Sequence, residues 1–197
     1  MNRYTIARTG GEKDGAAVPE LTLDHILWEP DCGVRARGQF RYDGQYLYVR
    51  LGAEEKEIRA EYRTAPAPVH EDSCLEFFFM PEGAEKYLNF EINPNGCLHI
   101  GFGTGRENRE RILLPGAEAY FDIRTRRTGT GWEVSYRIPA DFIRERYPGF
   151  ECTGKLRANV YKCGDRTAHP HYLAWNEVLT ETPDFHRPEY FGEMAFG

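Results

Sequence analysis

Alternation of apolar and polar side chains with a period of two is the feature of this sequence that most constrains its fold. Between residues 46 and 51 every second side chain is aliphatic, and the Asp43-Gly44 pair before them favours a tight type I′ turn. Since successive side chains of a strand point to opposite faces, this segment is predicted to be a strand with one buried face. The same pattern recurs at 87–93, 97–101, 121–125, 132–138 and 156–160.

The segment 74–80 differs, because its apolar run is interrupted only by Glu76. A strand of this kind is covered on both faces. A single short helix is predicted over residues 141–146, before Pro148. About ten strands without alternating helices favour an all-β fold, an antiparallel two-sheet β-sandwich of immunoglobulin-like or jelly-roll-like type. No linker divides the chain, so residues 1–197 are expected to form one domain with long loops.

Charge and composition argue against several classes of function. The 25 Lys and Arg residues against 31 Asp and Glu residues give a formal charge of −6, without a dense basic cluster. Such a chain gains little by displacing counterions from a phosphate backbone or by meeting acidic lipids, so neither nucleic acid nor a membrane is expected as a partner. No stretch approaches the roughly 20 apolar residues that span a bilayer.

The cysteines and the amino terminus bear on the compartment. Residues 1–10 lack the apolar centre of a secretory signal. Five cysteines are an odd number, and they form no C-x-x-C pair, which argues against a disulfide framework and against a structural zinc site. We therefore expect reduced thiols and a cytoplasmic location.

Glu76 is the most informative polar residue, because its carboxylate shares a strand face with Asp72 and Cys74. An isolated buried carboxylate is costly, so it must find partners or water. If neighbouring strands share this polar face, donors and acceptors surround the carboxylate: Tyr87, Asn89, Glu91, Arg157, Asn159 and Tyr161. Two interpretations stay open, an ion pair within the sheet or a polar floor that contacts a ligand.

Trp175 is the leading candidate for an aromatic platform, since it follows Tyr172 near a loop rich in His and Pro. An indole face matches the apolar C–H groups of a sugar ring, while planar amides and carboxylates match its hydroxyl rim. The alternative is a core tryptophan. Trp132 lies in a predicted strand and is expected in the core, whereas Trp28 has no readable context. Three long loops are candidates for binding residues: 65–72, 103–115 and 164–190.

Metal and catalytic interpretations have weaker support. His169-x-His171, with His186 or His70, offers ligands for a transition metal but lacks partners at fixed spacing. Loop carboxylates such as Glu71 and Asp72 are weak candidates for structural calcium, although no spaced calcium loop is present. A glycoside hydrolase would need Glu76 with a second carboxylate, Asp72 or Glu91, about 5 to 9.5 Å away across a cleft.

Several segments in the same order together resemble the family 9-like carbohydrate-binding modules, and none of them is a catalytic signature. They span most of the chain: 40–49, 70–79, 87–96, 132–139, 159–162 and 184–192. The resemblance implies a β-sandwich that clamps a terminal sugar between two aromatic walls, often with structural calcium. It makes Trp175 one wall and assigns hydroxyl contacts to Glu76 and Asn89. His70 stands where the second wall is expected, and Asn89 or Glu91 where an arginine would stand.

We therefore expect a non-catalytic protein that holds a mono- or oligosaccharide weakly and reversibly. One or two stacking contacts and four or five hydrogen bonds sum to about 5 to 7 kcal/mol, a dissociation constant between sub-millimolar and roughly 10 μM. The alternatives are a glycoside hydrolase or accessory domain of carbohydrate catabolism and, because relatives of this sandwich hold haem, a redox protein with Met80 as an iron ligand. The predicted contacts are Trp175, Glu76, His70, Asn89, Glu91, Asn159, Tyr161 and Tyr172.

Overall fold

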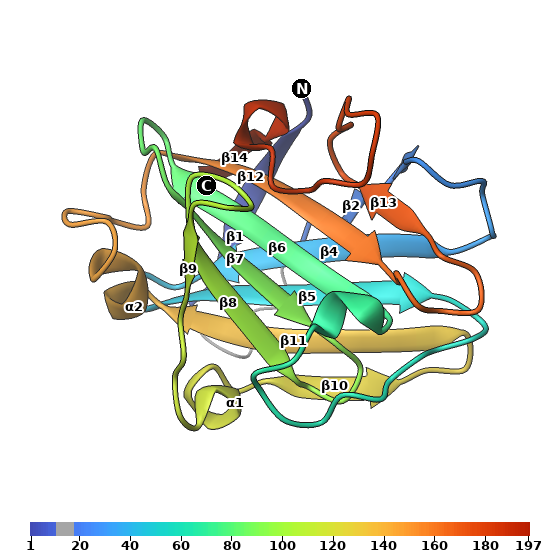
Figure 1. Ribbon diagram of the computed structural model, residues 1–197. Helices are drawn as coiled ribbons and strands as arrows, with labels where there is room; N and C mark the ends of the chain where they lie inside the picture. The colour runs from blue at the N-terminus through green and yellow to red at the C-terminus, as the bar shows by residue number, and fades with distance from the viewer. Residues whose placement is uncertain (11–17) are drawn as a thin grey trace.

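The computed structural model describes residues 1–10 and 18–197, and β-strands dominate the described chain (Figure 1). Strands β1 to β14 are, in chain order, Arg3–Arg8, Leu21–Thr22, His25–Ile26, Arg35–Tyr42, Tyr46–Glu54, Cys74–Pro81, Tyr87–Ile92, Leu98–Gly103, Arg109–Arg111, Arg124–Arg127, Gly131–Pro139, Lys155–Cys163, Tyr172–Ala174 and Gly192–Phe196. Helices α1 and α2 are Ala117–Tyr120 and Ala140–Arg144, and the 3-10 helices η1 and η2 are Val69–Glu71 and Pro188–Tyr190. The all-β class predicted from the alternation is confirmed.

The strands pair in one continuous path, which corrects the prediction of two antiparallel sheets. The path runs β10-β11-β5-β4-β1-β14-β12-β6-β7-β8-β9, and β2, β3 and β13 pair at its sides. Strand β1 is parallel to both of its neighbours, β14 and β4. The result is a curled mixed sheet whose β6 to β8 strands cross in front of β4, β5 and β11 (Figure 1). Alternation fixes the face that a side chain takes, but not the partner strand or its direction.

The turn predicted at Asp43-Gly44 is present and joins β4 to β5, and a second hairpin joins β7 to β8. Gly44 has a φ of 91° between β4 and β5, a conformation that costs glycine little. Asp43 Oδ1 accepts hydrogen bonds from the backbone nitrogens of Gln45 and Tyr46, at 2.8 Å each. Between β7 and β8, Asn93 Oδ1 accepts from Cys97 N at 2.9 Å. These local bonds fix the register of both hairpins.

Two apolar clusters cover the opposite faces of β6, as the apolar run at 74–80 predicted. The curled sheet has two layers, β6 to β8 in front and β4, β5 and β11 behind (Figure 1). Phe77 lies between these layers and packs against Phe40 of β4, with ring centroids 4.8 Å apart. Phe78 points the other way and packs edge-on against Tyr161 of β12, at 5.1 Å. The second cluster is covered by the long segment after β12, which ends in η2. This covered face carries the candidate site.

The helices differ in part from the prediction. Helix α2 occupies part of the expected 141–146 segment, but α1 was not predicted, and it shortens the strand expected at 121–125 to Arg124–Arg127. At the end of α1 the backbone nitrogen of Phe121 donates to the carbonyl of Ala117, and the Phe121 side chain is buried. Residue 121 is therefore apolar because it packs in the core, and not because it lies in a strand. No helix in the described part of the chain is long and apolar enough to cross a membrane.

Candidate binding pocket

A pocket of about 270 Å³ opens on the second face of β6, β7 and β12. Its floor comes from the strands, and its walls come from η1, from the β8–β9 hairpin, and from the segments before β4 and after β12. The lining residues are Trp28, His70, Glu76, Glu91, Arg106, Arg109, Cys163, Asp165, Tyr172, Pro183, Asp184, Phe185 and His186. The pocket therefore joins segments that are far apart in the sequence.

Two carboxyl groups lie side by side on the floor. Glu76 and Glu91 are register partners on β6 and β7, and both side chains are buried. Cys163 Sγ donates a hydrogen bond to Glu76 Oε1 at 3.0 Å, and Asn89 Nδ2 donates to Glu91 Oε1 at 2.8 Å. Each carboxyl thus has one partner that fixes it in the floor.

Burial changes the protonation of this pair. Loss of hydration raises the pKa of Glu76 well above its usual value, and the neighbouring Glu91 raises it further. Burial also raises the pKa of Glu91, although Arg109 opposes the shift from 3.6 Å. Because two adjacent carboxylates in a poorly hydrated floor repel each other, the pair retains protons at a higher pH than free carboxylates do. A protonated carboxyl both donates and accepts hydrogen bonds.

A basic side chain and a neutral histidine form the next wall. Arg109 Nη1 lies 2.6 Å from His186 Nε2, and Tyr87 Oη lies 2.8 Å from His186 Nδ1. Burial and the nearby Arg109 charge lower the pKa of His186 to about 2, so its imidazole is neutral. The ring also packs against Phe78, with centroids 5.0 Å apart. Arg109 therefore remains as a cation directed at the pocket and its floor.

Trp28 forms an aromatic wall with Tyr172 and Phe185. Its ring lies 5.5 Å from each of the other two, at 78° and 44° respectively. Its indole Nε1 donates to the carbonyl of Thr180 at 2.7 Å, which ties it to the segment after β13. Trp28 also has a φ of 57°, a conformation that is unfavourable for a bulky residue and is typical of functional positions.

The structure brings four of the residues proposed from sequence into this pocket: Glu76, Glu91, His70 and Tyr172. Glu76 and Glu91 meet because the alternation placed both on the polar side of their strands. His70 lies in η1, at the pocket rim, and is exposed. Whether these side chains contact a ligand remains a prediction.

The expectation of an accessible indole at Trp175 is wrong. Trp175 is only 4% exposed and packs in the apolar cluster between the two layers, on the other side of the sheet from Glu76. Its backbone nitrogen bonds to the carbonyl of Val160, so the chain continues along β12 beyond the end of β13. This pairing turns the indole into the core, where no sugar can stack on it.

Asn89, Asn159 and Tyr161 are buried and do not line the pocket. Asn159 Nδ2 donates to the Asn176 carbonyl at 3.0 Å, and its Oδ1 accepts from Asn176 N at 2.9 Å. Tyr161 Oη donates to the Phe185 carbonyl at 3.1 Å, and the two rings stack with centroids 4.0 Å apart. Asn159 and Tyr161 therefore support the pocket by holding the covering segment. Asn89 instead donates to Glu91 within β7, and its Oδ1 is buried without a hydrogen-bond partner among the described residues.

The proposed calcium ligands also have protein partners. Asp72 Oδ2 accepts from the backbone nitrogens of Glu61 and Tyr62, at 3.0 Å each, and from Asn93 Nδ2 at 2.8 Å. Glu71 accepts from Tyr62 Oη and pairs with Arg166 at 3.2 Å. Within residues 1–10 and 18–197, neither carboxyl belongs to a cluster of three or more side chains that could hold a metal ion. The structure therefore gives no support to the expected calcium site.

Several lining residues were not predicted from sequence. No position could be predicted for Trp28, because its contacts are with residues 144 or more positions away in the chain. Arg109 and Asp165 fall in the segments 103–115 and 164–190, which were predicted as long loops, and loop length was the only signal. The structure places Arg109 at the start of β9. Phe185 and His186 fall in a segment that contributed to the family resemblance, but no periodic pattern marks them.

Fold and pocket together define an all-β protein with a small pocket lined by polar and aromatic side chains, and the comparisons give its family. The model of carbohydrate-binding family 9 matches residues 12–196, so the chain belongs to that family. It is also similar to the UPF0462 protein C4orf33 homolog of Mus musculus, at 25% identity over 80% of this chain and 89% of the mouse protein. The human UPF0462 protein C4orf33 is 24% identical over 76% of this chain and 79% of its own length.

Solved structures show the same fold. A protein of Bacteroides uniformis, provisionally assigned as carbohydrate-binding, superposes with a TM-score of 0.88 and 25% identity, covering 99% of both chains. A family 9 carbohydrate-binding module of Caldicellulosiruptor kristjanssonii in complex with glucose gives a TM-score of 0.67 at 13% identity, covering 100% of this chain and 96% of the module. The family resemblance found in the sequence is confirmed.

Proposed function

We propose that this protein binds a mono- or oligosaccharide, weakly and reversibly, without transforming it. The observation that carries the proposal is the pocket itself, in which the aromatic faces of Trp28 and Tyr172 adjoin the polar groups of Glu76, Glu91 and Arg109. Sugar sites in proteins combine these two features, since the ring faces of a sugar are apolar and its edges carry hydroxyl groups.

The size of the pocket suits a small ligand. About 270 Å³ is at the lower limit of typical ligand cavities, which favours one sugar or the terminal ring of an oligosaccharide. Trp28 supplies one stacking face, in the role that the sequence had assigned to Trp175. The Arg109 guanidinium is a donor for hydroxyl oxygens. The Glu76–Glu91 pair, whose pKa values are both raised, offers acceptors and also a donor when it holds a proton.

The relatives support this proposal. Modules of the same family from Caldicellulosiruptor kristjanssonii are known in complex with glucose and with cellotriose. Glucose and short cello-oligosaccharides are therefore the first ligands to test. The expected dissociation constant stays between sub-millimolar and roughly 10 μM, because a pocket of this kind provides few stacking contacts and a handful of hydrogen bonds.

The geometry favours binding over hydrolysis. A glycosidase needs two carboxyl groups on either side of the scissile bond, with one of them ionised. Glu76 and Glu91 instead lie directly opposite each other on adjacent strands of one floor, and burial raises the pKa of both. They form one side of the pocket, and neither is placed to attack from the opposite face.

The test is a titration calorimetry panel of glucose, other hexoses and cello-oligosaccharides against the full chain. We expect a saturable heat for at least one sugar, about tenfold weaker in Trp28→Ala because one stacking contact is lost. Arg109→Ala should also weaken binding, whereas Arg41→Ala, on the outer face of β4, serves as the matched control and should leave it unchanged.

Two outcomes would overturn the proposal. One is the absence of binding for every sugar in the panel, with a folded protein shown by its thermal transition. The other is steady turnover of an aryl-glycoside that disappears in Glu76→Gln, which would make the protein a hydrolase.

A further inference from the structure

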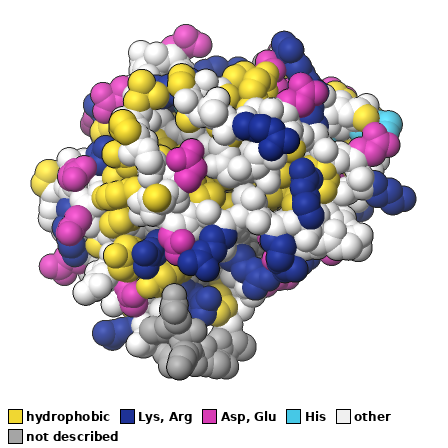
Figure 2. All heavy atoms as spheres, turned by 90° about the horizontal axis from the view of Figure 1, so that it is seen from below, with side chains coloured by type: hydrophobic (Ala, Val, Ile, Leu, Met, Phe, Trp, Pro, Cys, Tyr) yellow, Lys and Arg dark blue, Asp and Glu magenta, His cyan; other side chains and the backbone are white. Residues whose placement is uncertain are grey.

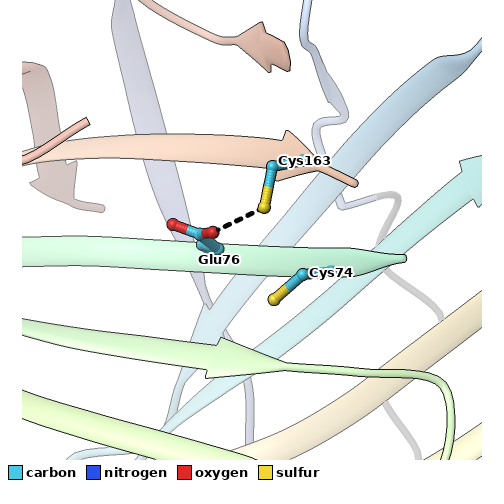
Figure 3. A group of neighbouring side chains, drawn as sticks. All are labelled: Cys74, Glu76 and Cys163. Atoms are coloured by element: carbon cyan, nitrogen blue, oxygen red, sulfur yellow. Dashed lines mark hydrogen bonds between the residues drawn. The ribbon is translucent and has the colours of Figure 1, made fainter. Parts of the chain in front are cut away.

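A compact group of sulfur and oxygen atoms lies at the floor of the pocket (Figure 3). Cys74 and Glu76 are two positions apart on β6 and share one face, and Cys163 of β12 is the register partner of Cys74. The two Sγ atoms and a carboxylate oxygen of Glu76 all lie within 4.8 Å of one another, and Cys163 Sγ is already 3.0 Å from Glu76 Oε1. Strand pairing thus joins two cysteines that are 89 residues apart in the sequence.

This spacing is close to that of a metal coordination sphere. Zinc binds thiolate sulfur at about 2.3 Å and carboxylate oxygen at about 2.0–2.2 Å in tetrahedral geometry, so its ligand atoms lie roughly 3.5–3.8 Å apart. The three atoms of the group need only small side-chain movements to reach such distances. Strands hold the three residues, and rigid elements place ligands more accurately than loops do.

The donor set selects the kind of metal. Two thiols disfavour calcium and magnesium, which take oxygen ligands, and favour zinc or a similar thiophilic ion. Glu76 and Cys163 line the pocket, so an ion reaches the group from there, and a fourth coordination position is open to water. Cys74 lies beneath them and is fully buried.

We propose that Cys74, Glu76 and Cys163 form a zinc-binding site at the floor of the pocket. The proposal rests on the geometry of these three side chains and does not depend on sugar binding. Binding converts two thiols to thiolates and releases two protons, with a third from Glu76 when its carboxyl is protonated. The bound ion then offsets two of the three negative charges of the two thiolates and the carboxylate.

Cobalt titration of the full chain, reduced and in the absence of sugar, tests the site directly. We expect one Co²⁺ per chain, with thiolate-to-cobalt charge-transfer absorption and visible bands of tetrahedral intensity, all lost when Zn²⁺ is added. Cys74→Ser and Cys163→Ser should each weaken binding at least about tenfold and reduce the charge-transfer band. Glu76→Gln should weaken binding but keep that band, because it removes no sulfur.

Cys97→Ser and Cys152→Ser are the matched controls, since both thiols are buried and free but lie outside the group. They should leave the titration unchanged. A second readout avoids folding defects: Zn²⁺ should protect Cys163, which lines the pocket, from alkylation in the unmodified chain, as mapped by mass spectrometry, and should leave the exposed Cys32 reactive.

Absence of the charge-transfer band in the reduced, folded chain would overturn the proposal. So would a band that persists undiminished in both Cys74→Ser and Cys163→Ser, or alkylation of Cys163 that Zn²⁺ does not slow. Because no sugar is present, each result is independent of the calorimetric panel, and either proposal can fail alone.

Discussion

Charged side chains occur in two contrasting settings in this molecule. On the outer face of β4, β5 and β11, Glu133 lies within 2.9 Å of Arg50 and 2.7 Å of Arg126, and both arginines are more than half exposed. Partial burial would raise the pKa of Glu133, but the hydrogen bonds from Arg50 and Arg126 outweigh it and lower that pKa. Figure 2, a view from below, shows basic side chains gathered among acidic ones on the surface.

The interior has charged side chains that are removed from water. Lys162 is fully buried and donates to Glu55 at 2.8 Å and to His171 Nε2 at 2.6 Å. In the pocket floor, no cationic side chain of residues 1–10 and 18–197 is in direct contact with Glu76, whose hydrogen-bond donor is Cys163. On the outer face, paired arginines lower the pKa of Glu133, whereas burial raises the pKa of Glu76 in the interior. We therefore expect the interior charges to have a larger effect than the surface charges on how the free energy of unfolding changes with mutation and with pH.

The largest effect is expected for Lys162→Met, which leaves the Glu55 carboxylate buried without its cation. Breaking a buried pair in this way costs about 3–5 kcal/mol. Urea unfolding at neutral pH measures the loss, and the double variant Lys162→Met with Glu55→Met should recover most of it. Arg50→Met on the outer face is the control, with an expected loss below about 1 kcal/mol. Equal losses in Lys162→Met and Arg50→Met would contradict the conclusion that the buried ion pair matters more for stability than the exposed one.

His171 should make the fold sensitive to acid. Burial, with the Lys162 charge beside it, lowers the pKa of His171 from 6.5 to about 4, so the unfolded chain binds a proton there more readily than the folded chain. Stability is therefore lost as the pH falls from about 6.5 to 4, by up to roughly 3 kcal/mol from this group. In His171→Gln that part of the slope should vanish. Thermal melts across this pH range would contradict the account if both proteins followed one curve.

Glu76 should give a slope of the opposite sign. Its folded pKa is raised, so its contribution is fully present below pH 4.5, the unfolded value, and is lost as the pH rises through the folded pKa. Glu76→Gln should therefore gain stability relative to the unmodified chain as the pH rises, by about 1–3 kcal/mol. Urea unfolding at pH 5 and pH 8 measures this difference, and a variant that loses stability at pH 8 would show that Glu76 is a paired carboxylate.

Glu133→Gln should have the smallest effect and completes the contrast. The lowered pKa of Glu133 gives stability that is present above pH 4.5 and is lost in acid. The variant is expected to lose about 0.2–1 kcal/mol at pH 7, and less in 1 M salt because exposed ion pairs are screened. A loss as large as that of Lys162→Met, measured by the same urea unfolding, would remove the distinction between the two settings.

The same contrast explains what the sequence was able to predict. Which face a strand residue takes is a local property, so the alternation placed Glu76 and Glu91 correctly and identified β6 as covered on both faces. Strand partners are non-local, so the parallel pairing of β1 and the meeting of Cys74 with Cys163 left no trace in the pattern. The resemblance supplied the family from segments spread over the chain.

The aromatic residues show where local inference fails. Trp175 follows a short strand and was interpreted as part of a loop, but pairing along β12 carries it into the core. Trp28 lies at the pocket because its indole bonds to Thr180 and packs on Phe185, residues that only the fold brings near. The positive φ of Trp28 is a property of the folded backbone, and the sequence does not indicate it.

The most direct test of the central claim uses the three tryptophans of the chain as reporters. In a ¹⁵N-labelled sample, each indole N–H gives one nuclear magnetic resonance signal, assigned by single Trp→Phe variants. Titration with glucose or cellotriose should shift the Trp28 signal along a saturable curve and leave the buried Trp132 and Trp175 signals in place. A Trp28 signal that stays fixed while another indole shifts, or three signals that never move, would contradict saccharide binding in this pocket.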